Sequence, residues 1–235
     1  MRAAGLWGRA VFFLLIFACA QIQTAEAKID KWADSHYDFK GIKAVYVEDI
    51  RLEAPVLSDI EEKLLMDSFW QQVNKGQPYT VLTMDAVERK ISLKTFRDWK
   101  KLAAQDAEEA QRVWSAELPN FVNAYAETVL KEYRLEPYVI PAHTELRTRT
   151  VRDYYYDRDG KRHEYTHEEP YTQFIPERHT ARSIIQMRFD VYDAVTRNKI
   201  FSREEYRVDN DSDDLKGMYG EIVRGCLRDF RKNIK

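Results

Sequence analysis

Apolar residues change from helical to alternating spacing near the middle of this chain of 235 residues, and that change limits the folds available to it. From Asp85 to Leu135 they recur at helical intervals in a sequence rich in Ala, Glu, Lys and Gln, with a break expected near Pro119. From Tyr138 onwards, apolar and polar residues alternate as they do on strands that cover one face of a core. Helices followed by half-buried antiparallel strands indicate an α/β fold.

A strand, a helix and a second strand are predicted ahead of this region. Residues 42–47 and 79–84 are β-branched and aromatic runs typical of buried strands. Between them Ser58 and Glu61 have the spacing of a capping box, which starts a helix that Gly76 ends. A right-handed crossover makes the two strands parallel.

The last third of the sequence predicts two more strands and a long amphipathic helix. Residues 184–193 alternate strictly, a turn follows, and residues 200–208 return as a more polar strand expected nearer an edge of the sheet. From Leu215 to Phe230 the apolar residues follow helical spacing, and Cys226 lies on their stripe, where a small buried side chain is expected. A charged sheet face that pairs ions in water is expected from six residues: Arg147, Arg149, Arg188, Asp190, Arg203 and Glu205.

The N-terminal segment has the layout of a secretory signal peptide. Arg2 and Arg9 precede an apolar run from Ala10 to Ala20, and small residues end at Ala27, after which cleavage is predicted. We therefore expect an exported protein, periplasmic or associated with the cell envelope. Membrane association is expected only if the segment is uncleaved or Cys19 is lipidated, and Phe17 departs from the small residue that a lipid-attachment box requires.

These elements predict a signal peptide over residues 1–27 and a single α/β domain over residues 28–235. The domain is expected to contain a mixed, largely antiparallel sheet, covered on one face by amphipathic helices, with a projecting β-hairpin over about residues 152–168. The formal net charge is −2 with both signs interspersed, which argues against a nucleic-acid partner.

One motif indicates chemistry: His163, Glu164 and His167 fit H-E-x-x-H, the zinc signature of many metallopeptidases. That chemistry needs a helix, which places both histidines and the water-activating glutamate together. The neighbours favour a hairpin instead, because Asp159-Gly160 is a strong turn dipeptide and the preceding tyrosines are β-prone. In a strand Glu164 points away from the histidines, so a zinc-dependent hydrolase is the alternative hypothesis and no metal or other cofactor is expected.

Folded about a two-residue Asp159-Gly160 turn, the hairpin is expected to pair Tyr156 with His163 and Tyr154 with Tyr165. This pairing collects five amphipathic rings on one face as a recognition patch. These residues are Tyr154, Tyr156, His163, Tyr165 and His167. Packing of the same rings on the domain is the other interpretation. No catalytic residues are predicted, and the favoured function is a non-enzymatic binding or assembly module whose partner is an envelope protein or a cell-wall component.

Several phrases of the sequence carry a family resemblance. They are the residues 38–43 that precede the first strand, the Val-Tyr-Asp that ends at Asp193, the return over residues 200–203 and the final amphipathic helix. Together they resemble a group of exported bacterial envelope proteins and lipoproteins of unknown function, some similar in layout to the TolB amino-terminal domain. The resemblance implies a bacterial cell and supplies no catalytic residues.

Overall fold

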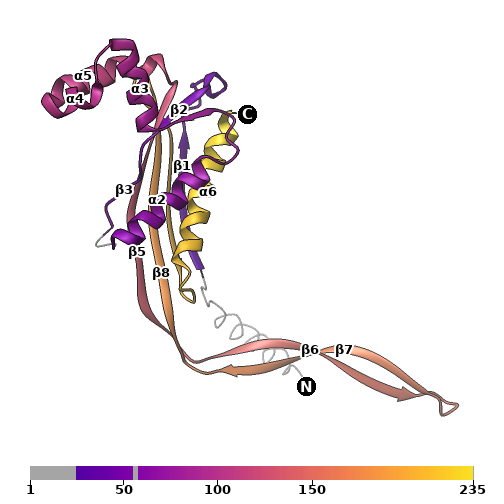
Figure 1. Cartoon of the computed structure of the whole chain (residues 1–235). Helices are drawn as coiled ribbons and strands as arrows, with labels where there is room; N and C mark the ends of the chain where they lie inside the picture. Colours follow the sequence, from indigo (N-terminus) through magenta and orange to yellow (C-terminus); the bar gives the residue numbers. More distant parts are fainter. Residues whose placement is uncertain (1–24, 55–57, 235) are drawn as a thin grey trace, which may run out of the picture. The chain divides into compact units, whose positions relative to one another are not determined.

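The computed structural model describes residues 25–54 and 58–234, which form two compact units (Figure 1). Residues 25–136 and 182–234 form the first, called the sheet unit below, and residues 137–181 form the second, called the hairpin unit. Cys19 and most of the predicted signal peptide lie outside the described residues. No helix in the described part of the chain is long and apolar enough to cross a membrane.

The expected fold class is confirmed: a mixed sheet of seven strands with helices, and a separate two-stranded sheet. The main path of the large sheet runs β1-β9-β8-β5-β2-β4, and β3 pairs with β5. Pairing is parallel among β4, β2, β3 and β5 and antiparallel among β1, β9 and β8. The strands are β1 Ala25–Ala33, β2 Ala44–Val47, β3 Arg51–Leu52, β4 Thr80–Leu82, β5 Ala124–Ile140, β8 Arg178–Asp193 and β9 Lys199–Asp209.

The described helices include the two predicted after Ser58 and from Leu215, and the helical region predicted from Asp85 is divided into three. They are α2 Asp59–Val73, α3 Met84–Thr95, α4 Trp99–Gln105, α5 Ala107–Glu117 and α6 Leu215–Ile234. The capping box at the start of α2 is confirmed, because the Glu61 N–H donates to Ser58 Oγ and the Ser58 N–H donates to the Glu61 carboxylate, both at 3.3 Å. The predicted parallel pairing of β2 with β4 is also confirmed.

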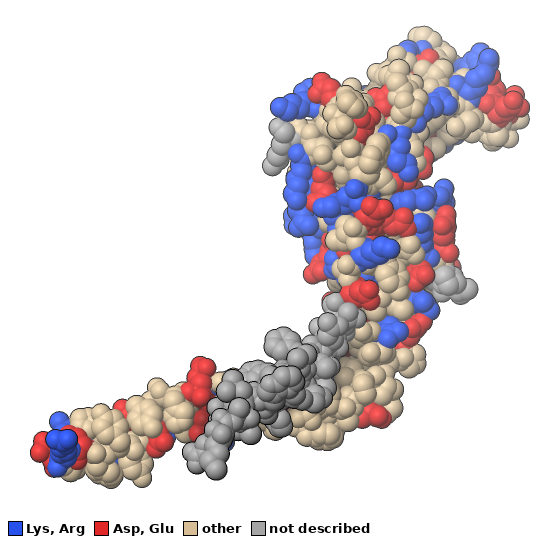
Figure 2. Space-filling model, turned by 180° about the vertical axis from the view of Figure 1, so that it is seen from behind, with Lys and Arg blue, Asp and Glu red and all other residues tan. Residues whose placement is uncertain are grey.

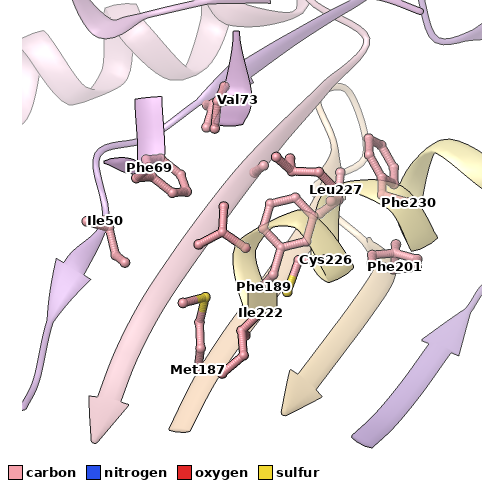
Figure 3. Close-up of a cluster of buried hydrophobic side chains, with 14 of the residues drawn as sticks. Ile50, Phe69, Val73, Met187, Phe189, Phe201, Ile222, Cys226, Leu227 and Phe230 are labelled. Atoms are coloured by element: carbon pink, nitrogen blue, oxygen red, sulfur yellow. The ribbon is translucent and has the colours of Figure 1, made fainter. Parts of the chain in front are cut away.

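The main core lies where α2 and α6 cover one face of the large sheet (Figure 3). Phe230 of α6 contacts the rings of Phe39, Tyr79, Phe189 and Phe201 at centroid distances of 5.5–6.4 Å. Cys226 lies in this core, as predicted, and burial raises the pKa of its thiol to about 12. The residue is therefore an unreactive apolar packing group.

A second, smaller core holds α3 and α5 against the sheet. Tyr46 belongs to it, whereas its neighbours Val45 and Val47 belong to the main core, because side chains alternate between the two faces of β2. The Tyr46 ring contacts Trp114 of α5 edge-on, with centroids 5.4 Å apart. Helical packing on both sides of β2 leaves this strand with almost no exposed side chain.

The helical prediction was wrong for residues 121–135, where a short turn leads into β5, which begins at Ala124. The first half of this strand is central in the sheet, between β2 and β8, and buries side chains on both faces, so its apolar residues do not alternate cleanly. Ala124, Ala126, Val129 and Leu130 are all nearly inaccessible. A short apolar run of this kind has the same spacing in a buried strand as in a buried helix.

As predicted, β9 lies nearer an edge of the sheet than β8. The edge strand itself, β1, was not predicted, and it pairs with β9 antiparallel from Ala25↔Asp209 to Ala33↔Phe201. The β1 sequence is polar, and its Ile29 and Trp32 stay about half exposed, so it lacks the pattern of a core strand. The first three residues of β1 fall within the predicted signal peptide, and cleavage there remains a prediction.

Arg203 and Glu205 do not lie on the water-facing charged face that the sequence predicted. Both are buried beneath α6, where the Arg203 guanidinium contacts Glu205 and Asp229. On the opposite face of the sheet, acidic and basic side chains are interspersed (Figure 2), and Lys131 contacts Glu204 at 2.6 Å. Of the other four predicted residues, Arg147 and Arg149 lie on β6 and Asp190 is buried, so the six do not form one water-facing face.

Candidate functional site

The hairpin unit is built from β6, His143–Tyr156, and β7, Arg162–Ile175, paired antiparallel along their full length. The loop between them closes with the Asp157 N–H donating to the Lys161 carbonyl and the Gly160 N–H donating to the Asp157 carbonyl, both at 3.0 Å. Gly160 has a φ of +73°, which glycine adopts without strain, whereas Asp159 does not have a positive φ. The hairpin turn is therefore a three-residue loop with a left-handed glycine rather than a two-residue turn.

The extra loop residue shifts the register by one position from the predicted pairing. Tyr155, not Tyr156, lies opposite His163, and Asp153, not Tyr154, lies opposite Tyr165. A one-residue shift moves every side chain of a strand to the other face relative to its partner. The predicted gathering of five rings on one face was therefore wrong.

Four rings do gather on one face, which we call the stacked face: Tyr155, His163, Tyr165 and His167. Tyr155 stacks on His163 with centroids 5.2 Å apart, and Tyr165 stacks on His167 at 5.6 Å. Tyr155 and Tyr165 remain 55% and 46% exposed, so the stack is open to a partner.

The two other predicted site residues, Tyr154 and Tyr156, lie on the opposite face. Their rings meet edge-on at 5.9 Å, and the Arg162 guanidinium lies 4.3 Å from the centre of the Tyr154 ring. Sequence reasoning missed Leu146 and Phe174 on this same face, each 67% exposed. The signal for them is present in the sequence, because both alternate with polar residues along the two strands of the hairpin.

Residues 162–175 are extended, as the hairpin prediction required, so the H-E-x-x-H residues are not on a helix. His163 and His167 share the stacked face, whereas Glu164 lies opposite Tyr154 on the other face. Each histidine contacts a carboxylate: His163 Nε2 lies 2.7 Å from Asp157 and His167 Nε2 lies 3.3 Å from Glu169. The geometry that zinc hydrolysis demands is absent from this segment.

These contacts also set the charge state of the carboxylates on the stacked face. The hydrogen bond from His163, together with backbone N–H groups of the loop, lowers the pKa of Asp157. Arg149 and then His167 lower the pKa of Glu169 in the same way. Within the described residues no group of three or more His, Cys, Asp or Glu side chains is placed to hold a metal ion.

The two outer edges of the hairpin differ in what they offer a further strand. The Asp157 N–H donates to the Lys161 carbonyl, so these two residues form a hydrogen-bonded pair between the strands. Odd-numbered residues of β6 and β7 therefore direct their N–H and C=O groups toward the partner strand. Even-numbered residues direct theirs toward the outer edges of the hairpin. Pro170 is therefore placed where its missing N–H faces outward on β7, and β6 has no proline. On β6 the Tyr154 N–H donates to Asp153 Oδ1 at 2.9 Å, and no other described strand pairs with this edge.

No protein-family model and no curated protein match this sequence. Among solved structures, a PelC dodecamer from Paraburkholderia phytofirmans is similar in structure, with 9% sequence identity and a TM-score of 0.39. The match covers 88% of this chain and 98% of the PelC chain. A second PelC dodecamer from the same organism, a single-residue variant, has a TM-score of 0.43, with 9% identity over 88% of this chain and 99% of its own. Lipoprotein GNA1162 from Neisseria meningitidis is similar to 81% of this chain over 99% of its own, with 12% identity and a TM-score of 0.33. Likeness at this level carries no argument about function.

Proposed function

We propose that this protein is a non-enzymatic binding or assembly module of the bacterial cell envelope and that hairpin β6–β7 is its binding element. The observation that supports this most strongly is that two 14-residue strands form a sheet of their own with exposed rings. An isolated two-stranded hairpin is marginally stable at best in water, so a third strand from a partner would stabilise it. The envelope location rests on the predicted signal peptide.

The partner that fits the hairpin best is a protein that adds a strand to the outer edge of β6. Added strands gain affinity from backbone hydrogen bonds and specificity from alternate side chains. The outward backbone groups of β6 before Tyr154, whose N–H is bonded to Asp153, supply the first. The exposed Leu146 and Tyr154 on one face and Tyr155 on the other supply the second. A cell-wall glycan has no backbone amides in the spacing of a strand, so an envelope protein is the better match.

Proline substitution on the two edges tests this proposal. Thr148→Pro removes an outward N–H from β6 and leaves the β6–β7 ladder intact, and Thr172→Pro makes the matched change on β7, where Pro170 already interrupts the edge. We expect Thr148→Pro to reduce the capture of envelope proteins by the full chain at least tenfold and Thr172→Pro to leave it unchanged. Capture is quantified by mass spectrometry of proteins retained from an envelope extract.

Side-chain substitutions test the two faces of the hairpin separately from the backbone edge of β6. Tyr155→Ala with Tyr165→Ala removes the exposed stack, and Leu146→Ser with Phe174→Ser removes the apolar residues of the other face. At least one pair is expected to reduce capture of the same partner. An unchanged set of retained proteins across all four variants would remove the hairpin from the proposal.

A further inference from the structure

A surface hollow of about 610 Å³ lies in the sheet unit, where the end of α2 meets α6 and β9. Its charged lining is five cations and one anion: Lys75, Arg207, Arg224, Arg228, Arg231 and Glu221. The lining thus has an excess of four positive charges, in a chain whose formal net charge is −2. Positive charge is thus concentrated at this hollow.

Two of the five cations have structural partners. Arg207 contacts Glu205 and donates to Glu221 at 2.7 Å, so its charge is balanced inside the protein. Arg231 donates to the carbonyls of Leu227 and Gly76, both at 3.2 Å, and lies in the last turn of α6, where a cation complements the helix dipole. Neither side chain needs a ligand to account for it.

The other three cations lack such partners. Arg224 makes no hydrogen bond or ion pair with any described residue, and the Lys75 ammonium makes none either. Arg228 approaches Asp229 only at 3.8 Å, and Asp229 is already contacted by Lys31, Lys232 and Arg203. Both arginines precede the last turn of α6, so the helix dipole does not account for them.

Arg224 and Arg228 also stand four residues apart on one helix, where like charges repel. An arrangement that costs stability and has no internal counterion is typical of a site that binds an anion. Guanidinium groups present paired donors in a plane that matches the oxygens of a phosphate group. A phosphate monoester carries close to two negative charges at neutral pH and so matches an excess of several positive charges better than one carboxylate does.

We propose that this hollow binds a phosphate group, held by Arg224 and Arg228 with Lys75 and Arg231 at its rim. The group can come from a soluble phosphate compound or from the headgroup of an anionic phospholipid. The site belongs wholly to the sheet unit and depends on neither the hairpin nor the proposed function.

The test measures binding of inorganic phosphate to the full chain by isothermal titration calorimetry at low ionic strength, and binding to vesicles by cosedimentation. Vesicles of neutral phosphatidylcholine are compared with vesicles that also contain phosphatidic acid. The site variant carries Arg224→Gln and Arg228→Gln. The control variant carries Arg89→Gln and Arg112→Gln, which remove the same charge from α3 and α5 outside this hollow. Thermal unfolding of both variants checks that they fold.

We expect the native chain and the control variant to bind at least one of the two phosphate sources and the site variant to bind it at least tenfold more weakly. Binding of free phosphate identifies a soluble source, and binding of phosphatidic acid vesicles alone identifies a lipid source. Equal weakening in the site and control variants would mean that only net charge matters, and would overturn the proposal. The absence of binding by the native chain to both sources would overturn it as well.

Discussion

The strand β9 and the strand β6 have similar alternating sequences but end in opposite environments. In β9 the side chains Phe201, Arg203 and Glu205 lie beneath α6 and are almost fully buried. In β6 the corresponding alternate residues remain exposed on both faces within the described part of the chain. Alternation in a sequence therefore predicts a strand, whereas burial depends on whether another element covers that strand.

Whether a strand is covered also determines how much its ion pairs contribute to stability in the two units. Beneath α6, Arg203 and its carboxylate partners are held in the core, and changes there affect the whole unit. On the hairpin, the ion pairs are exposed and each contributes little. We therefore expect mutations in the core of the sheet unit to change stability and mutations in the hairpin unit to change the capture of envelope proteins.

Removing one aromatic ring from each unit gives the largest contrast. Phe230→Ala leaves a cavity among four other rings of the main core and should lower the free energy of unfolding by about 3–5 kcal/mol. Tyr155→Ala removes a ring that is 55% exposed and should change it by less than about 1 kcal/mol. Chemical denaturation followed by tryptophan fluorescence measures how each change affects the unfolding of the sheet unit, because all the described tryptophans belong to that unit. Equal losses would show that the hairpin contributes to the core.

The buried ion cluster gives the second contrast, this time within the sheet unit. Arg203→Met leaves Glu205 and Asp229 buried without their shared guanidinium and should cost about 3–5 kcal/mol. Lys232→Met removes a cation that contacts the same Asp229 from an exposed position, and should cost less than about 1 kcal/mol. Urea unfolding of the two variants compares them, and a loss below 1 kcal/mol for Arg203→Met would contradict the assigned role.

Sequence reasoning predicted the elements whose signals are local. Ser58 and Glu61 specified the start of α2, and the apolar stripe of α6 specified both that helix and the burial of Cys226. It failed where tertiary context decides the outcome. β5 resembles a helix because it is buried on both faces, and β1 resembles a polar leader because it pairs with β9 while leaving its side chains exposed.

The sequence predicted that the candidate site is a β-hairpin, but it did not predict the correct pairing of the residues on the two strands. The strand conformation of residues 163–167 followed from Asp159-Gly160 and the β-prone tyrosines, and it correctly separated Glu164 from the histidines. Which tyrosines join the histidines depends on whether the loop has two or three residues. That choice depends on the backbone of Asp159 and Gly160, which the dipeptide alone does not specify.

Two buried glycines of α6 differ in the space that a side chain would have on the same helix. A Cβ at Gly225 would lie 2.8 Å from Arg203 Nη2, and that guanidinium cannot move without breaking its ion pairs. Gly225→Ala should therefore cost about 1–3 kcal/mol. At Gly220 the nearest atom would be 3.7 Å away, so Gly220→Ala should instead stabilise the helix by about 0.5–1 kcal/mol. Midpoints of thermal unfolding that shift in the same direction would contradict this assignment.

The smallest expected effect concerns acid and the turn of the hairpin. The pKa of Asp157 is lowered by His163 and by loop N–H groups from an ordinary value of 3.8, so the folded turn favours the ionised form. Its contribution to stability is therefore complete above about pH 4 and is lost as the pH falls through the lowered value. Cross-strand NMR contacts between Tyr155 and His163 should weaken from pH 5 to pH 2 in the native chain. Asp157→Asn keeps the acceptor oxygen but not the charge, so its turn should weaken much less over the same range. Contacts of equal strength at pH 5 and pH 2 in the native chain would show that the turn does not depend on this carboxylate and that the left-handed Gly160 alone determines the register.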